Sequence, residues 1–433
     1  MGTKTQKLSN VVDQIVEWQS VKTSGFTAVA GEGYFCNTSG GAFTATLPAS
    51  PNAGDTVAFK DYGDDFGTNA LRIARNGKLI QGGASDSEIT TDRASVVCVF
   101  IDDTKGWLFT NESNVADLQL ATYITATGGT VTTSGDFKIH SFTGDGCFVV
   151  SQVGNPVGGP SVVDYLVVAG GGGGGSSVGD TVAAGGGGAG GYRESHSTPV
   201  SGCYTASPLA TPTGLTVSAQ TYPVTVGGGG AGGTNSPTQS ISGSNSTFST
   251  ITSTGGGRGS NSESSTPGSS GGSGGGGSWN RYTGGNGNTP PVSPPQGNTG
   301  GSPGSPTIQS GGGGGGASAV GQNNNGNNGG AGGDGTPSEI SGSATSRAGG
   351  GGGGGGYLGT SNTGGAGGNG GGGAGGAVIE SPAAHDGTAG TANRGGGGGG
   401  GGGEGDNTAP QLSNSNGGSG GSGIVIIRYK FQN

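Results

Sequence analysis

Glycine dominates the second half of this chain. Ninety of the 111 glycines lie after residue 169, where they form eight uninterrupted runs of four or more residues. The runs are Gly170–Gly175, Gly185–Gly188, Gly227–Gly230, Gly274–Gly277, Gly311–Gly316, Gly349–Gly356, Gly370–Gly373 and Gly395–Gly403. Glycine loses more backbone freedom on ordering than any other residue. Such a sequence is therefore expected to be either a flexible tether or a structure that needs backbones without side chains.

The second option has a defined geometry. Polyproline-II-type helices have about three residues per turn and no internal hydrogen bonds. Without side chains, such helices can lie side by side and hydrogen-bond to one another. The runs therefore predict a polyglycine-II helix bundle over residues 170–433, a sandwich whose connecting loops carry the chemistry. The strand-like segments that recur between the runs argue against a disordered tether. The irregular loops argue against an ice-binding polyglycine-II protein.

The composition excludes several classes of protein. Only 28% of the 433 residues are hydrophobic and 10% are charged, which is too few apolar residues for one ordinary core. The net charge of −9 argues against a nucleic-acid partner, because phosphate binding needs clustered Lys and Arg. Cys36, Cys98, Cys147 and Cys203 lack metal-ligand spacing and predict free thiols in a reducing compartment. No signal peptide or membrane span is predicted, so we expect a soluble protein made in the cytoplasm.

Residues 1–22 contain one short helical pattern. Leu8, Val12, Ile15 and Trp18 recur at spacings of four, three and three, which predicts a helix with a narrow apolar seam. A helix of about three turns is too short to stand alone in water. We expect it either to associate with copies of itself or another protein, or to pack on its own domain.

Residues 23–115 predict a small β-domain with short strands separated by turns. Asn76-Gly77 between β-rich segments is typical of a type I′ turn. The expected strands are 26–30, 43–47, 56–60, 71–74, 96–101 and 107–110.

Three aspartates form an acidic loop in this domain. Asp61, Asp64 and Asp65 surround Gly63, but their spacing is not that of the DxDxDG calcium loop. Both a calcium site and a solvated acidic turn are open interpretations, and the spacing favours the turn. No metal or other cofactor is predicted.

Residues 116–169 predict the strands that form the base of the glycine-rich domain. Residues 126–132 and 137–142 resemble a hairpin, and 164–168 is a buried-type strand that runs into the first glycine run. The terminal segment 424–431 is its counterpart. We expect these two strands to pair, so that the chain enters and leaves the block at one end, the proximal end. We call each stretch of chain that crosses the block a pass, and the end opposite the proximal one distal. If passes alternate in direction, the distal loops are predicted at 176–184, 234–239, 260–270, 290–296, 317–325, 357–363 and 404–416.

These junctions resemble a known family. Tyr165–Ala169, Tyr222–Val226 and Ser249–Thr254 run into glycines, and Gly423–Tyr429 runs out of them. In this they resemble the glycine-rich domain of tailed-phage fibre proteins and the adhesin that caps long tail fibres of T-even-like phages. Residues 33–111 resemble the small β-domain near the start of phage tail-fibre and short-tail proteins. The resemblance implies a polyglycine-II sandwich with receptor-binding loops, a virion location and a homotrimer.

The sequence offers no catalytic constellation. His140, His196 and His385 lie far apart, no GxSxG elbow is present, and the GxGxxG strings lack a βαβ context. Glu404 and Asp406 are expected to be solvated loop acids rather than a glycosidase pair. We therefore expect no enzyme.

The distal loops remain as the candidate site, since exposed loops on rigid scaffolds are common recognition elements. In the alternative interpretation, Tyr357 and Leu358 only cap the glycine block. The candidate receptor-binding residues are Val178, Asp180, Val320, Gln322, Asn323, Tyr357, Leu358, Asn362, Asp406, Asn407, Gln411 and Leu412.

The sequence therefore predicts an all-β protein plus a polyglycine-II helix bundle, with segments 1–22, 23–115, 116–169 and 170–433. Its expected function is that of a phage tail-fibre adhesin that binds a host-surface protein or glycan and joins other virion tail proteins through its N-terminus. The alternative is a purely structural tail or capsid-surface spacer.

Overall fold

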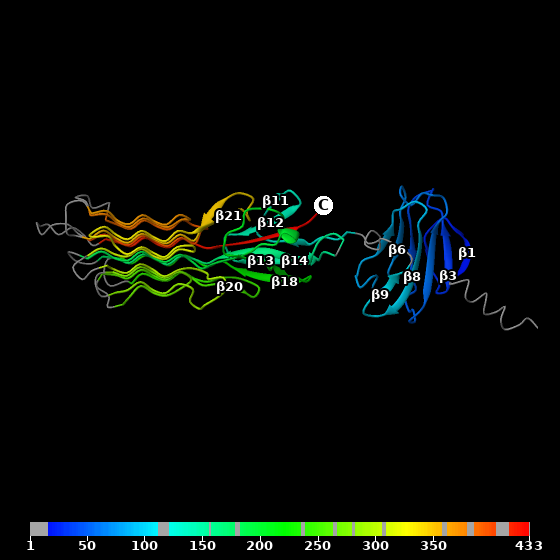
Figure 1. Ribbon diagram of the computed structural model, residues 1–433, viewed down its shortest axis with the longest axis horizontal. Helices are drawn as coiled ribbons and strands as arrows, with labels where there is room; N and C mark the ends of the chain where they lie inside the picture. The colour runs from blue at the N-terminus through cyan, green and yellow to red at the C-terminus, as the bar shows by residue number, and fades with distance from the viewer. Residues whose placement is uncertain are drawn as a thin grey trace, which may run out of the picture. The chain divides into compact units, whose positions relative to one another are not determined.

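The computed structural model divides into two compact units, Met1–Tyr123 with Gly154–Gly159, and Ile124–Val153 with Pro160–Asn433. We call them the N-terminal unit and the glycine-rich unit (Figure 1). The structure describes residues 16–110, 121–155, 157–177, 182–234, 239–262, 266–278, 282–304, 309–356, 362–378, 385–403 and 415–432.

Two β-sheets pack face to face in the N-terminal unit. The five-stranded sheet has the order β1 (Glu17–Lys22), β3 (Glu32–Cys36), β5 (Thr56–Asp61), β8 (Ser95–Asp102), β9 (Gly106–Phe109). The four-stranded sheet has the order β2 (Phe26–Thr27), β4 (Phe43–Thr46), β6 (Leu71–Ala74), β7 (Ser87–Ile89). Alternate residues point inward, as in β8, where Val96, Cys98 and Phe100 enter the core. Side chains from both sheets, including Phe59 and Trp107, form one apolar core.

The predicted N-terminal helix is wrong where the structure describes it. Glu17–Lys22 is strand β1, which pairs in parallel with β3. Trp18 lies on this strand, 42% exposed, and stacks on Phe35 with ring centroids 4.7 Å apart. The sheet pairing outweighs the helical spacing of the apolar residues. Leu8, Val12 and Ile15 lie outside the described residues.

The six strands expected in this domain are present, β6 at the predicted residues and the other five with shifted ends, and β1, β3 and β7 were not predicted. The Asn76-Gly77 turn is confirmed by positive φ at both residues, 48° and 87°, and by the bond from Lys78 N to Arg75 O at 3.1 Å. The turn lies in the long connection between the paired strands β6 and β7, and so it is not the tight turn of a two-residue hairpin.

The glycine-rich unit begins with β-sheets. A seven-stranded sheet contains the path β11 (Thr130–Ser134), β12 (Phe137–Phe142), β23 (Ile424–Lys430), β14 (Val162–Val168), β15 (Tyr192–Ser195), β16 (Ala210–Thr211), with β17 (Leu215–Thr216) beside β14. A second sheet has the order β10 (Thr125–Thr127), β13 (Gly146–Gln152), β18 (Thr221–Thr225), β19 (Ser246–Phe248), β20 (Ile251–Ser253). The short helix α2 (Thr198–Ser201) and the hairpin of β21 (Thr336–Ser338) with β22 (Thr345–Arg347) complete it.

The predicted pairing of the two buried strands is confirmed. β14 and β23 are antiparallel neighbours, with Asp164 opposite Arg428 and Val168 opposite Ile424. Both strands are buried on both faces, between one cluster around Phe148 and another around Tyr192. Entry to and exit from the glycine-rich block therefore lie side by side, at the proximal end.

Buried polar groups tie the connecting segments to this sheet. The Asp164 carboxylate accepts hydrogen bonds from Ser195 Oγ at 2.7 Å, Ser197 N at 2.8 Å and Ser201 Oγ at 2.6 Å. Glu194 accepts from Tyr192 Oη at 2.5 Å and Ser338 Oγ at 2.6 Å. Burial, reinforced by the Glu194 charge, holds the pKa of Tyr192 well above its usual range, so this hydroxyl stays a donor. Satisfied buried networks of this kind favour one arrangement of the elements they join.

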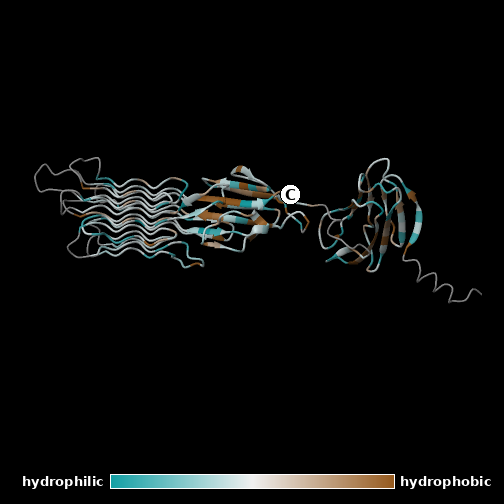
Figure 2. Cartoon of the chain, turned by 45° about the horizontal axis from the view of Figure 1, so that its top comes forward, coloured by the Kyte–Doolittle hydropathy of each residue, from teal (hydrophilic) through white to brown (hydrophobic). Residues whose placement is uncertain are grey.

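The glycine-rich residues beyond the sheets form extended passes that run back and forth beside one another (Figure 1). Their hydropathy is close to neutral, in contrast with the apolar strands (Figure 2). None of the described glycine runs is a β-strand. The block is therefore held together by something other than an apolar core.

Candidate functional site: the distal end of the glycine-rich block

Hydrogen bonds within the block repeat every third residue. Gly171 N and Gly174 N donate to Gly421 O and Gly418 O, both at 2.9 Å. The N–H groups of Gly172 and Gly175 instead reach Gly188 O and Gly185 O, both at 2.9 Å. Gly170 N and Gly173 N reach Ser244 O at 3.1 Å and Ile241 O at 2.9 Å. One pass thus donates in turn to three different neighbours.

The same spacing recurs in the two longest runs. Gly351 N and Gly354 N donate to Gly187 O and Ala184 O, both at 2.9 Å. Gly398 N and Gly401 N donate to Gly172 O at 2.9 Å and Gly175 O at 3.0 Å. The first pair of passes is antiparallel and the second is parallel. Neighbouring passes can therefore run in either direction and still pair.

Close approach of the backbones explains the need for glycine. A Cβ atom built on Gly172 would lie 2.2 Å from Gly257 O, and one on Gly174 would lie 2.0 Å from Gly399 O. Real Cβ atoms do not approach backbone oxygens this closely. Where a pass faces solvent, the restriction disappears, since a Cβ on Gly228 would meet nothing within 4 Å.

The number of passes differs from the prediction in two regions. The first is the segment 364–376, expected to be one returning pass. It contains a turn at Asn369–Gly371, with φ of 99° at Gly370 and 102° at Gly371, and the chain then goes out again. Val378 consequently lies at the distal end, where its N–H donates to Asn362 O at 2.9 Å.

The second region is 271–325. A bend at 271–273 adds a turn that the sequence analysis missed, which reverses the direction of the passes that follow. Residues 290–296 were expected to be distal but lie at the proximal end, where Tyr192 N donates to Gln296 O at 2.8 Å. Residues 317–325 do not form one distal loop either. Ala317 N donates to Ala348 O at 2.9 Å in the proximal core, and the distal turn is at 325–328.

The structure places four of the candidate recognition residues. Val320, 60% exposed, follows the proximal turn, and Gln322 and Asn323 lie along the outgoing pass. Asn323 Oδ1 accepts the Ser302 N–H at 2.8 Å. Only Asn362 lies at the distal end, where its Nδ2 donates to Gly356 O at 2.6 Å. Val178, Asp180, Tyr357, Leu358, Asp406, Asn407, Gln411 and Leu412 lie outside the described residues, as does Glu404.

Serine and asparagine side chains cap the last backbone groups at the distal end. Asn261 Oδ1 accepts the Ser176 N–H at 3.2 Å, and Asn324 bridges Gly304 N at 2.7 Å and Ser310 O at 2.9 Å. Ser415 Oγ donates to Gly402 O, and Ser177 and Ser415 form a β-bridge. These caps hold the points at which loops leave the block. These caps were not predicted, although Ser and Asn at the ends of glycine passes are a visible signal in the sequence.

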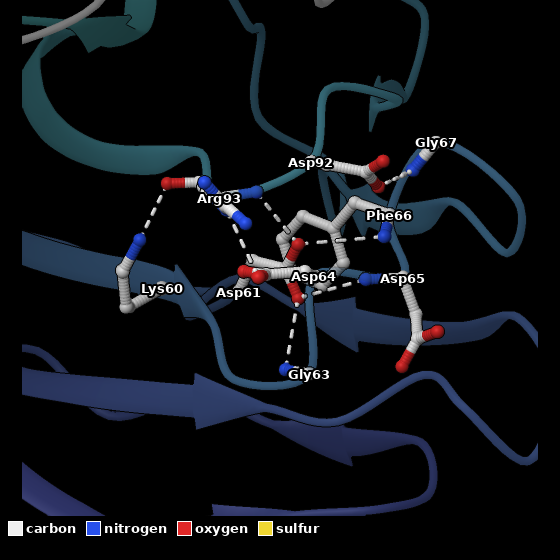
Figure 3. Close-up of polar contacts among 9 residues, drawn as sticks. All are labelled: Lys60, Asp61, Gly63, Asp64, Asp65, Phe66, Gly67, Asp92 and Arg93. Atoms are coloured by element: carbon white, nitrogen blue, oxygen red, sulfur yellow. Dashed lines mark hydrogen bonds and ion pairs between the residues drawn. The ribbon is translucent and has the colours of Figure 1, made fainter.

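The acidic loop of the N-terminal unit is not a solvated turn at its centre (Figure 3). Asp61 is 3% exposed, and its carboxylate accepts N–H groups of Arg93 at 2.9 Å, Gly63 at 3.3 Å and Phe66 at 3.4 Å. Asp64 forms an ion pair with Arg93 at 2.9 Å. Asp61 therefore closes the loop on itself by accepting backbone donors.

The remaining polar groups have structural surroundings. Cys36 and Cys98 are buried free thiols, and burial raises the pKa of Cys36 to about 12. Cys147 and Cys203 are exposed and free. Both ring nitrogens of buried His140 are used, Nδ1 with Gly128 O at 2.7 Å and Nε2 with Tyr429 Oη at 3.0 Å. Among the described residues, no group of three or more His, Cys, Asp or Glu is placed to hold a metal ion, and no helix could cross a membrane.

Comparison with known proteins identifies the family. Residues 149–430 match the family model described as the glycine-rich domain. The match covers more than half of the chain, so the protein belongs to this family. No curated protein matches the chain.

Proposed function

We propose that the glycine-rich unit is a polyglycine-II bundle that presents recognition loops at its distal end, in a bacteriophage tail-fibre adhesin. The observation that carries the proposal is the three-residue repeat of N–H directions, with neighbours in both orientations. A helix with three residues per turn has this property. A bundle of such helices is a rigid support, and rigid supports position binding loops.

Side chains are confined to the ends of such a bundle. The interior passes carry glycine because Cβ atoms would meet neighbouring oxygens, so they can offer a partner only backbone groups. We therefore assign specificity to the predicted distal loops, among them 357–363 and 404–416. The family resemblance assigns these loops a host-surface protein or glycan, and assigns the N-terminus contacts with other virion tail proteins and a homotrimeric state.

Adsorption measurements test this function. Alanine replacement of Tyr357, Leu358, Asn407 and Gln411 is expected to reduce binding of the purified protein to host cells by several orders of magnitude, since single recognition residues contribute about 1–2 kcal/mol or more. The matched control replaces four exposed threonines at the proximal end and is expected to bind normally: Thr205, Thr213, Thr216 and Thr221. Both variants should keep the melting temperature of the parent protein.

A structural spacer is the second candidate, because Asn362 at the distal end is occupied with the block's own backbone. Normal adsorption of the loop variant would favour the spacer. Immunogold labelling of intact virions then separates a tail location from a capsid-surface location.

A further inference from the structure

A polar cavity of about 470 Å³ opens at the proximal end of the block, away from the distal loops. One wall is the β21–β22 hairpin, which contributes Pro337 and Ser346. Asp334 and the turn at Asn369–Gly371 form a second wall, and Arg394 forms a third. Its volume falls within the roughly 300–1,000 Å³ of small-molecule sites.

Three side chains around this cavity retain hydrogen-bonding capacity. Asp334 Oδ1 accepts the Asn369 N–H at 2.8 Å, while Oδ2 has no partner among the described residues. The Asn369 side-chain amide likewise has none there. Arg394 makes one long bond, from Nη1 to Ser346 O at 3.5 Å. The Arg394 guanidinium has five N–H donors in a planar fork, and most of them are therefore available to a ligand.

The carboxylate and the guanidinium are not paired with each other. Among the described residues, the ion pairs all lie in the N-terminal unit, and none joins Asp334 to Arg394. The cavity thus holds a free acceptor on one wall and a free cationic donor on another. A ligand lying between them can carry an anionic group toward Arg394 and hydroxyl donors toward Asp334.

The backbone that carries these side chains is hydrogen-bonded. Asn369 is held by its N–H bond to Asp334 and by its carbonyl, which accepts the Gly335 N–H at 2.7 Å. Asp334 O accepts from Ser318 N at 3.0 Å, and Arg394 O accepts from Ala348 N at 2.8 Å. A backbone held in this way loses less conformational entropy when a ligand binds than a free chain does.

We infer that this cavity binds a carboxylate-bearing sugar, at a site separate from the distal loops. The carboxylate pairs with the Arg394 guanidinium, whose fork matches it in a bidentate geometry. Ring hydroxyls donate to Asp334 Oδ2 and exchange hydrogen bonds with the Asn369 amide. Pro337 and Ala344 supply the small apolar surface that the C–H face of a sugar ring can cover. The inference is independent of the proposed role of the loops.

Saturation-transfer NMR and calorimetric titration of the full chain test this site. The probes are methyl galacturonide and its neutral counterpart, methyl galactoside. We expect the uronide to bind in the millimolar range and the neutral sugar to bind about tenfold more weakly, because a hydrogen bond to a charged group contributes more than a neutral one. Equal binding of the two sugars, or no binding of the uronide, overturns the inference.

Two variants locate the binding. Arg394→Gln should lower uronide affinity about tenfold and abolish the preference over the galactoside. Asp334→Asn should weaken both sugars, while its Oδ1 can still accept the Asn369 N–H. The matched control Arg72→Gln lies in the N-terminal unit and should bind as the parent does. Uronide binding that persists unchanged in Arg394→Gln, whose exposed side chain supports no described core, places the sugar elsewhere and contradicts the assignment.

Discussion

The N-terminal unit and the glycine-rich block are ordered by opposite means. In the N-terminal unit, side chains such as Phe59 and Trp107 exclude water from a core between two sheets, and each strand pairs only with its neighbours in its own sheet or with a connecting segment. In the glycine-rich block, the backbone is itself the interior, and each pass hydrogen-bonds to neighbours on several sides. The first arrangement depends on filling space with side chains, and the second depends on having none. The N-terminal unit should therefore be sensitive to the loss of side chains, and the glycine-rich block to their addition.

Removing a large side chain from the core of the N-terminal unit is expected to have the largest effect. Phe59→Ala leaves a cavity in a fully buried site and should cost about 3–5 kcal/mol. In calorimetry of the full chain we expect two transitions, of which this variant lowers one. Tyr62→Ala, at a position 59% exposed, is the control and should shift neither. A single transition that moves as a whole would show that the units are not independent.

Adding one methyl group should damage the glycine-rich block. Gly172→Ala forces a Cβ to within 2.2 Å of Gly257 O and should cost about 1–3 kcal/mol, lowering only the second transition. Gly228→Ala is the matched control, because the same methyl meets nothing within 4 Å, and it should be neutral or slightly stabilising. If both variants melt alike, close backbone approach does not explain the glycine content.

Each unit also contains a buried carboxylate that accepts several hydrogen bonds, from backbone N–H groups at Asp61 and from one N–H and two serine hydroxyls at Asp164. Asp61→Asn leaves donors without an acceptor in the N-terminal unit and should cost about 1–2 kcal/mol. Asp164→Asn should cost a similar amount in the glycine-rich unit. Each variant is expected to lower one transition only. A shift in the other transition would contradict the division into two units.

The smallest effect is a pH dependence carried by His140. Burial lowers the pKa of His140 below its usual value of 6.5, so the imidazole stays neutral in the folded state while the unfolded chain binds a proton. Stability of the glycine-rich unit should therefore fall as pH drops below about 6.5 and level off below the folded-state pKa. Melting between pH 8 and pH 5 measures this, and His140→Gln should flatten the dependence of that transition. An unchanged slope in the variant would assign the effect to another group.

Elements with a pattern of side chains could be predicted from the sequence, whereas turns within uninterrupted glycine could not. The pairing of 164–168 with 424–431 followed from two apolar runs at the edges of the glycine block. The turn at Asn369–Gly371 was missed because glycine on both sides gives no stop signal, and positive φ costs glycine nothing. That omission placed Val378 at the wrong end of the block, and the missed bend at 271–273 displaced the predicted distal loops 290–296 and 317–325. Trp18 was predicted to lie on a helix because of its spacing from the preceding apolar residues. That spacing gives no information on the pairing of its segment with strand β3.

Buried polar roles were also beyond the sequence. Asp61 resembled a surface acid, and nothing in its neighbours in sequence indicates that Arg93, 32 residues away, would supply a backbone donor. Asp334 and Arg394 come together only because the passes fold back on one another. Long-range pairing through backbone groups leaves no residue-type signature.

The three-residue repeat restricts how proteins of this design can change in length. Deleting one or two residues from Gly349–Gly356 would rotate the following peptides of that pass away from their partners on its three neighbours. Insertions and deletions should therefore accumulate in the loops, or arrive as a whole outgoing and returning pair of passes. Because β14 and β23 adjoin, an added pair leaves the strand base untouched. Homologous proteins are thus expected to differ in the length of this block by whole helical repeats or by whole pairs of passes, much as a repeat array grows by whole units.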